Sequence, residues 1–153
     1  MAKAAKAIPE GYHTVTPYMI VHDGAGALEF YSKAFNAQER FRYEHEGKIG
    51  HAEIQIGDSV IMLADEYPEM GIRSAKSFGG SPISIHLYVE DVDAFIDQAV
   101  RSGAKLQRPI EDKFYGDRAG GIEDPYGHSW YVSTHKEDLS PEEMKERAAK
   151  AGM

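Results

Sequence analysis

The feature that most constrains the fold is an order of strand and helix signals that occurs twice, at an offset of about 68 residues. Each copy starts with a strand-forming segment, continues with an amphipathic helix and ends with three more strand-forming segments. Asn36 and Gly103 follow the two helices, and Leu63 and Val132 lie in the two last strands. The sequence therefore predicts a duplicated βαβββ module.

Residue spacing places the elements within each copy. Leu28, Tyr31 and Phe35 recur at helical spacing, and strands are expected where β-forming residues alternate with polar ones. Pro17 indicates an edge position or a bulge for the first strand. The expected elements are strand 14–21, helix 24–36 and strands 38–45, 51–56 and 60–64 in the first copy, and strand 83–89, helix 91–102 and strands 105–115, 118–123 and 129–135 in the second.

The segments outside the two copies complete the expected organisation. Residues 1–13 form an N-terminal arm, and residues 14–135 form a single domain of two modules, 14–65 and 83–135. The connector 66–82 holds three glycines, two prolines and no clear periodicity, so it is expected to be a loop or a lid. In the tail, 136–153, Ser140 and Pro141 predict a helix start. The fold class is α+β with a C-terminal helix.

Composition excludes several classes of function. The net charge of −8 argues against nucleic acid and anionic membranes as partners. The chain has no cysteine, which excludes disulfides, thiolate nucleophiles and thiolate metal sites. No apolar run approaches the roughly 20 residues of a membrane span, and residues 1–10 lack the hydrophobic core of a signal peptide. We expect a cytoplasmic protein.

Several segments resemble the vicinal oxygen chelate superfamily, which contains glyoxalases, bleomycin resistance proteins and extradiol dioxygenases, and within it the PhnB-like branch. The segments are VTPYMIV, ALEFYSKAF, GHAEIQIGDSVIMLADE, IHLYVEDVDAF and FYGDRAGGIEDPYGHSWYVSTH. The resemblance implies a curled mixed sheet whose open face forms a cup. It also implies a homodimer, in which the arm and the tail helix could hold the partner chain.

Alternation along the strands, combined with this resemblance, divides the strand residues between two faces. The helix-covered face is expected to hold Ala52, Ile54, Ile61, Leu63, Ile85, Leu87, Val89, Trp130 and Val132. The cup, and therefore the small-molecule ligand, is expected to contact Thr16, Tyr18, His51, Glu53, Gln55, Met62, Ser84, His86, Tyr88 and Tyr131. A register shift of one residue would exchange the two sets.

The resemblance also implies where a metal would bind. Metal-dependent members take one His or Glu from the first and last strands of each half, and these positions hold Thr16, Met62, Ser84 and Tyr131 here. None is a suitable ligand for a hard divalent ion, so we expect no cofactor. The alternative is a divalent metal at a different place, held by His51, Glu53 and His86.

Three functions follow from these patterns. The first is a binding protein for a small organic molecule, without the usual metal. The second is a glyoxalase-like lyase or isomerase, or a dioxygenase-like enzyme, with a relocated metal or with His86 or Glu53 as general base. The third is a dimeric assembly protein with a vestigial pocket. Arg118 is a further ligand candidate, since it could clamp a carboxylate or phosphate, or else pair with an acid in the chain.

Overall fold

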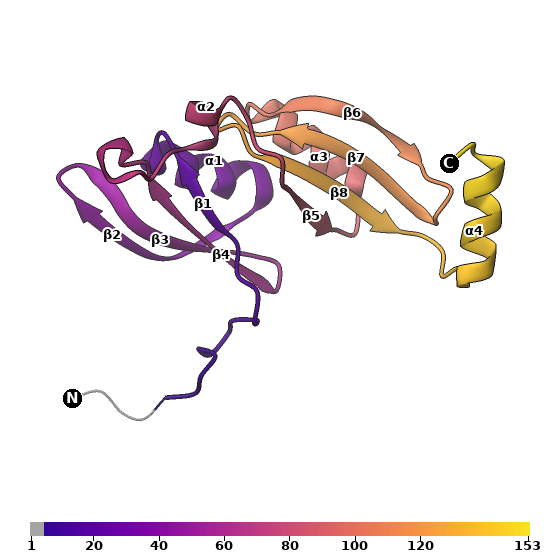
Figure 1. Ribbon diagram of the computed structural model, residues 1–153, viewed down its shortest axis with the longest axis horizontal. Helices are drawn as coiled ribbons and strands as arrows, with labels where there is room; N and C mark the ends of the chain where they lie inside the picture. Colours follow the sequence, from indigo (N-terminus) through magenta and orange to yellow (C-terminus); the bar gives the residue numbers. More distant parts are fainter. Residues whose placement is uncertain (1–4) are drawn as a thin grey trace. The chain divides into compact units, whose positions relative to one another are not determined.

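The computed structural model describes residues 5–153 and divides into two compact units, with the boundary between Gly80 and Ser81. Each unit contains one four-stranded mixed sheet and one long helix packed against it (Figure 1). The predicted α+β class, the duplicated βαβββ order and the C-terminal helix are confirmed. The grouping of 14–135 into a single domain stays a prediction. Among the described residues, no helix is long and apolar enough to cross a membrane.

The first unit follows the predicted order. Its elements are β1 (Tyr18–Val21), α1 (Gly24–Phe35), β2 (Gln38–His45), β3 (Lys48–Ile56) and β4 (Ser59–Asp65). The sheet order is β1-β4-β3-β2, in which β1 runs parallel to β4 and the other neighbours are antiparallel. This arrangement places β1 and β2 at the edges of the sheet.

Helix α1 forms because its ends are capped and one side of it is apolar. The Asp23 side chain accepts a hydrogen bond from the Gly26 amide, and Asn36 ends the helix in the left-handed conformation (φ 55°). Leu28, Tyr31 and Phe35 are buried. They lie over Ala52, Ile54, Ile61 and Leu63, which are also buried, so the predicted alternation of the first sheet is confirmed. Burial of each large aliphatic or phenylalanine side chain in this set stabilises the folded state by about 1.5–3 kcal/mol.

Asp65, at the end of β4, ties the helix to a bulge in β3. Its two carboxylate oxygens accept hydrogen bonds from the amides of Gly24 (2.8 Å) and Ile49 (2.7 Å), and the residue is only 7% exposed. The bulge lies where Tyr43 pairs with His51 but Glu44 pairs with Ile49. The buried Asp65 carboxylate thus supplies the hydrogen-bond acceptor for two backbone amides, one in α1 and one in β3.

The second unit repeats the plan and adds the tail. Its elements are β5 (Ser84–Tyr88), α3 (Val92–Arg101), β6 (Lys105–Asp112), β7 (Asp117–Glu123), β8 (Ser129–His135) and α4 (Pro141–Lys150). The sheet order is β5-β8-β7-β6, with β5 parallel to β8. Trp130 and Val132 are buried, as predicted for the face that α3 covers, and Ile85, Leu87 and Val89 are half-buried.

The turn between β7 and β8 is organised by the buried Asp124. One of its oxygens accepts hydrogen bonds from the amides of Tyr126 (2.8 Å) and His128 (3.0 Å), and the other accepts from the indole Nε1 of Trp130 (2.8 Å). Trp130 is 1% exposed. The turn and the core of the second unit are therefore connected through one carboxylate.

Several predicted boundaries were wrong, among them the start of β3, which is Lys48 and not residue 51. Strand β1 begins at Tyr18 and not at residue 14, because Pro17 has no amide hydrogen to extend the pairing. Strand β6 ends at Asp112 and not at 115, because the Gly116 amide bonds to the Lys113 carbonyl and closes a turn. The connector is not a plain loop, since it contains η1 (Pro68–Met70) and α2 (Ala75–Phe78). The tail helix α4 begins at Pro141 with Ser140 as its N-cap, as predicted.

Candidate functional site

The face of the first sheet opposite α1 carries the first group of candidate residues. Tyr18 pairs with Met62, and Met62 pairs with Glu53 on the next strand, so the three side chains share this open face. His51 lies two residues before Glu53 on the same side. These side chains are partly exposed while their alternate neighbours are buried. The sequence prediction for Tyr18, His51, Glu53 and Met62 therefore matches the observed faces of the sheet.

Four of the side chains on this face form a continuous hydrogen-bonded chain. The Tyr18 hydroxyl lies 2.8 Å from Nδ1 of His51, and Nε2 of His51 lies 2.9 Å from Oε2 of Glu53. The Tyr12 hydroxyl donates to the other oxygen of Glu53. Because a carboxylate only accepts, Nε2 of His51 carries a hydrogen, and in the neutral ring Nδ1 accepts from Tyr18. The order of the chain is Tyr18, His51, Glu53, Tyr12.

The environment keeps the two phenols protonated and the carboxyl ionised. Burial, and then the charge of Glu53, raises the pKa of Tyr18. The hydrogen bond to Glu53 raises the pKa of Tyr12, and the same hydrogen bond lowers the pKa of Glu53. The ionised carboxylate therefore holds the His51 ring in one orientation, with its Nδ1 toward Tyr18.

A pocket of about 670 Å³ opens beside this chain on the same unit. It is lined mainly by apolar and aromatic side chains, and its size is typical of a site for a small organic ligand. The lining residues are Tyr18, Ile20, Tyr43, His45, Gly50, Ala64, Asp65, Tyr67, Met70 and Ile72. Tyr18 belongs both to the pocket wall and to the hydrogen-bonded chain, so its phenol is the link between them.

The Tyr43 wall of the pocket depends on the absence of a side chain at Gly50. A Cβ at residue 50 would lie 2.8 Å from Cδ1 and 3.0 Å from Cε1 of the Tyr43 ring. Tyr43 therefore rests directly on the backbone of the bulge in β3, and its ring is nearly parallel to the His45 ring (interplanar angle 9°). The centres of the two rings lie 6.5 Å apart, so both rings contribute to the same wall of the pocket.

The connector supplies the opposite wall and is fixed in place. Tyr67 and Ile72 exchange backbone hydrogen bonds of 2.7 and 3.1 Å, which close the loop that carries Met70. The ammonium group of Lys48 lies 4.8 Å from the centre of the Tyr67 ring and donates to the Glu66 carbonyl. One carboxylate oxygen of Glu66 accepts from the Ser74 amide (2.9 Å) and from the Ser77 hydroxyl (2.6 Å).

Acid is expected to loosen this connector through Glu66. The Ser77 hydroxyl, and next the Ser74 amide, lower the pKa of Glu66 from 4.5 to about 2. Since the pKa is lower in the folded state, the stabilisation is complete above the ordinary value and is lost as the pH falls toward 2. We expect the Ser74 amide proton resonance to titrate with a midpoint well below the ordinary carboxyl range.

The matched variants separate this effect from general acid unfolding. Glu66→Gln is expected to abolish the titration of the Ser74 resonance, whereas Glu69→Gln, an exposed acid of the same connector, is expected to leave it unchanged. A midpoint at the ordinary value of 4.5 would contradict the proposed anchoring.

The open face of the second sheet carries the remaining predicted residues. Ser84 pairs with Ser129 and His86 pairs with Tyr131, so Ser84, His86 and Tyr131 share a face as predicted, with Tyr88 on the same strand. His86 lies 2.8 Å from the Ser133 hydroxyl and stacks on Tyr88 with 4.8 Å between ring centres. The Tyr131 hydroxyl lies 3.1 Å from the Tyr115 hydroxyl, and burial raises the pKa of Tyr115.

The residues at the metal positions that the resemblance implied do not suit a hard divalent ion. Thr16 lies before β1 with its hydroxyl 3.4 Å from the His13 carbonyl, Met62 offers a thioether, and Tyr131 is a phenol bonded to another phenol. In residues 5–153, no group of three or more His, Cys, Asp or Glu side chains is arranged to hold a metal ion. Of the alternative trio, His51 and Glu53 bond to each other in the first unit, and His86 lies in the second.

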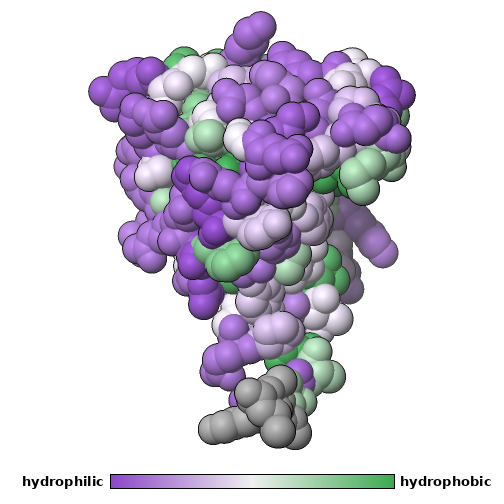
Figure 2. All heavy atoms as spheres, turned by 90° about the vertical axis from the view of Figure 1, so that its left-hand side faces the viewer, coloured by the Kyte–Doolittle hydropathy of each residue, from purple (hydrophilic) through white to green (hydrophobic). Residues whose placement is uncertain are grey.

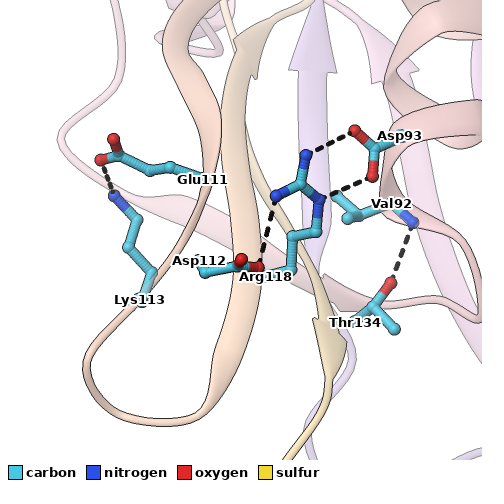
Figure 3. Close-up of polar contacts among 7 residues, drawn as sticks. All are labelled: Val92, Asp93, Glu111, Asp112, Lys113, Arg118 and Thr134. Atoms are coloured by element: carbon cyan, nitrogen blue, oxygen red, sulfur yellow. Dashed lines mark hydrogen bonds and ion pairs between the residues drawn. The ribbon is translucent and has the colours of Figure 1, made fainter.

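Arg118 does not share the face of the other candidates. It pairs with Thr134, which lies on the α3 side and accepts a hydrogen bond from the Val92 amide (Figure 3). Its guanidinium makes two hydrogen bonds to Asp93 (2.8 and 3.0 Å) and one to Asp112 (3.3 Å). All three guanidinium nitrogens are thus engaged by carboxylates of the chain. Of the two interpretations of Arg118, a ligand contact or an ion pair within the chain, the structure shows the ion pair.

The sequence analysis missed most of the pocket wall. Phe41, Tyr43 and His45 alternate along β2, and this period of two was the available signal for an aromatic open face. Tyr67, Met70 and Ile72 gave no such signal, because the path of the connector depends on Lys48 and Glu66. Gln55, predicted to contact the ligand, instead accepts a hydrogen bond from Arg40 (3.0 Å) and is not part of the wall.

The face shown in Figure 2 is mainly hydrophilic, with small hydrophobic areas between the hydrophilic ones. Apolar side chains scattered singly over a hydrophilic surface need no special explanation. The pocket is therefore the feature that most needs a functional explanation.

Comparisons with known proteins agree with the fold. A model of the Glyoxalase/Bleomycin resistance protein/Dioxygenase superfamily matches residues 12–132. The chain is 37% identical over 142 residues to an uncharacterized protein of Mycobacterium bovis, covering 90% of this chain and 93% of that protein. A protein of Mycobacterium tuberculosis is also 37% identical, with 90% and 84% covered.

Solved structures show the same architecture. A gene product of Arabidopsis thaliana superposes with a TM-score of 0.66 at 26% identity, covering 80% of this chain and 98% of that one. TioX from Micromonospora sp. ML1 gives a TM-score of 0.64 at 22% identity, with 80% and 98% covered. A PhnB protein from Bacillus cereus gives 0.61 at 19% identity, with 80% and 99% covered.

Proposed function

The chain belongs to the glyoxalase/bleomycin resistance protein/dioxygenase superfamily, and from this membership and the geometry of the first unit we propose that it binds a small, flat organic molecule in the pocket beside β1. The ligand lies against the rings of Tyr43 and His45 from β2 and against Tyr67 and Met70 from the connector. Binding requires no metal, because the residues at the positions that ligate metal in relatives do not suit one.

The observation that carries this proposal is the composition of the pocket wall. The wall contains three tyrosines, a histidine and several aliphatic groups, and its described residues include no lysine or arginine. Tyr18 is 49% exposed and Tyr43 is 53% exposed, so large apolar areas remain uncovered. Aromatic walls favour a flat partner, and phenol groups orient its polar atoms. The wall itself offers no lysine or arginine to pair with a carboxylate or phosphate.

A direct test is a binding screen by NMR with neutral flat aromatics and with matched carboxylates. We expect the neutral compounds to shift resonances of Tyr43, Tyr67 and Met70, and the carboxylates to bind more weakly. If no compound shifted these resonances, or if only the carboxylates did, the proposal would be wrong.

Substituting Gly50 by alanine is expected to close the pocket without unfolding the protein. The added methyl would overlap the Tyr43 ring and displace it toward solvent, since the Tyr43 side chain is 53% exposed. We expect binding of a neutral aromatic to weaken at least about tenfold, with a stability change of about 1 kcal/mol or less.

The matched control is Gly121→Ala, on the open face of β7 in the second sheet, where the added methyl would lie 3.3 Å or more from the Arg108 side chain. It is expected to bind like the wild type. Equal binding by Gly50→Ala, measured by the same NMR titration, would show that Tyr43 does not contact the ligand.

The enzyme alternative is supported by the hydrogen bonds that join Tyr18, His51 and Glu53, because such a chain can move a proton. The homodimer and the cytoplasmic location stay predictions, and sizing of the protein in solution tests the first.

A further inference from the structure

We propose that Tyr18 is a catalytic residue that removes a proton from the molecule in the pocket and passes its own proton to His51. This inference rests on the proposed function, since Tyr18 acts on whatever occupies that pocket. The substrate class is a small uncharged organic molecule with a proton made acidic by a neighbouring electron-withdrawing group, such as a carbonyl. The reaction class is metal-free proton abstraction, which leads to isomerisation or elimination.

The position of Tyr18 carries the first step of the argument. Its ring forms part of the pocket wall, and its hydroxyl hydrogen points to Nδ1 of His51 at 2.8 Å. A phenol that donates its hydrogen keeps oxygen lone pairs that can accept another proton. Of the four residues in the chain, Tyr18 lines the pocket, whereas His51, Glu53 and Tyr12 are not among the lining residues.

The second step is the arrangement behind Tyr18. His51 contacts Glu53 through Nε2 at 2.9 Å, and Glu53 also accepts from Tyr12. This is the geometry of an activated group, its base and an orienting carboxylate, in which the carboxylate stabilises the imidazolium that forms. His51 and Glu53 are therefore positioning residues, and Tyr12 holds Glu53 on the side that His51 leaves open.

The proton transfer balances without any further reactant. The bond between the substrate atom and its hydrogen breaks, and its electron pair stays on the substrate as an enolate-type anion or expels a leaving group. The hydrogen moves to the Tyr18 oxygen while the original Tyr18 hydrogen moves to Nδ1 of His51. The imidazolium then stands against the Glu53 carboxylate. Return of both protons restores the enzyme and completes an isomerisation.

Tyr18 needs His51 for this chemistry. Burial raises the pKa of Tyr18, so the free phenolate is scarce at neutral pH and the residue alone would be a poor base. Simultaneous transfer to His51 avoids the phenolate altogether. General base catalysis of this kind is worth about 10²–10⁴-fold in rate.

The experiment uses 5-nitrobenzisoxazole, a flat neutral aromatic whose ring opens when a base removes the proton on carbon 3. The N–O bond breaks as the carbon gives up its proton, and the coloured 2-cyano-4-nitrophenolate forms without any co-reactant. We expect the intact protein to accelerate this elimination above the buffer rate. We expect Tyr18→Phe and His51→Asn each to lose at least about tenfold of that acceleration, in line with the loss of a general base.

The controls separate the roles. Tyr126→Phe, in the turn between β7 and β8 and outside both the pocket wall and the hydrogen-bonded chain, is expected to react like the wild type. Glu53→Gln is expected to lower the maximal rate while leaving the concentration for half-maximal rate unchanged, because Glu53 does not line the pocket. If Glu53→Gln lowered the maximal rate and also raised the concentration for half-maximal rate, Glu53 would have a structural role only.

The outcomes distinguish this inference from the proposed function. If the probe shifted the Tyr43 and Tyr67 resonances but reacted no faster than in buffer, or if Tyr18→Phe kept the full rate, the proton transfer would be overturned and the binding pocket would stand. If the probe neither shifted these resonances nor reacted, both proposals would fail. Acceleration that depends on Tyr18 and His51 supports both.

Discussion

Replacing Asp124 by alanine lowers the free energy of unfolding of the second unit by about 3–5 kcal/mol, which is the largest effect that we expect of any single substitution. The residue is 2% exposed, and its carboxylate accepts three hydrogen bonds. Alanine would leave the amides of Tyr126 and His128 and the buried indole of Trp130 without this acceptor. Each unsatisfied buried donor costs about 1–3 kcal/mol, and partial relaxation of the turn recovers some of the sum.

Urea unfolding followed by tryptophan fluorescence measures this effect directly, because Trp130 is the one tryptophan of the chain. The matched control is Asp58→Ala, in the corresponding turn of the first unit. Asp58 is exposed and bonds only to the neighbouring Ser59 hydroxyl in the contacts described, so its loss is expected to cost about 0.5 kcal/mol or less. A cost below about 1 kcal/mol for Asp124→Ala would contradict the role of this carboxylate.

The second large effect is expected at Asp65. Asp65→Ala removes the acceptor for the Gly24 and Ile49 amides and is expected to lower the free energy of unfolding of the first unit by about 2–4 kcal/mol. The bulge that carries Gly50 loses its anchor at the same time, so we expect Tyr43 to move and the pocket to lose this part of its wall. We therefore expect a loss of ligand binding together with the loss of stability.

Asp23→Ala is the matched control for Asp65, because both carboxylates bond to amides at the start of α1. Asp23 is exposed and bonds to one amide, so its loss is expected to cost about 1 kcal/mol and to leave the bulge intact. Amide hydrogen exchange distinguishes the two variants, since only Asp65→Ala is expected to speed exchange at Ile49. Slow exchange at Ile49 in Asp65→Ala would show that the bulge is held by other contacts.

The faces of the strands were predictable because alternation is a local property. Ala52, Ile54 and Leu63 are buried and His51 and Glu53 are not, as a period of two requires. The prediction survived the bulge at Gly50 because the bulge lies before His51. Trp130 in the core was predictable for the same reason.

The pairing partners of individual polar residues were not predictable. Arg118 follows a turn in the sequence, and the choice between a ligand and an internal ion pair depended on Asp93, which lies 25 residues away. Likewise, Glu53 was expected in the cup, but its bond to Tyr12 joins residues separated by 41 positions. Contacts over such distances depend on the register of strands and on the path of loops, which leave no periodic pattern.

The duplicated βαβββ order, the helix ends and the two faces of each sheet follow from local sequence, because caps and periodicity act over a few neighbouring residues. The contact of Tyr18 with both the pocket and His51, and the contribution of the connector to the pocket wall, became visible only in the folded chain. A pocket consists of side chains brought together by strand pairing, by the bulge at Gly50 and by the anchoring of the connector through Glu66, and none of these can be read from local spacing.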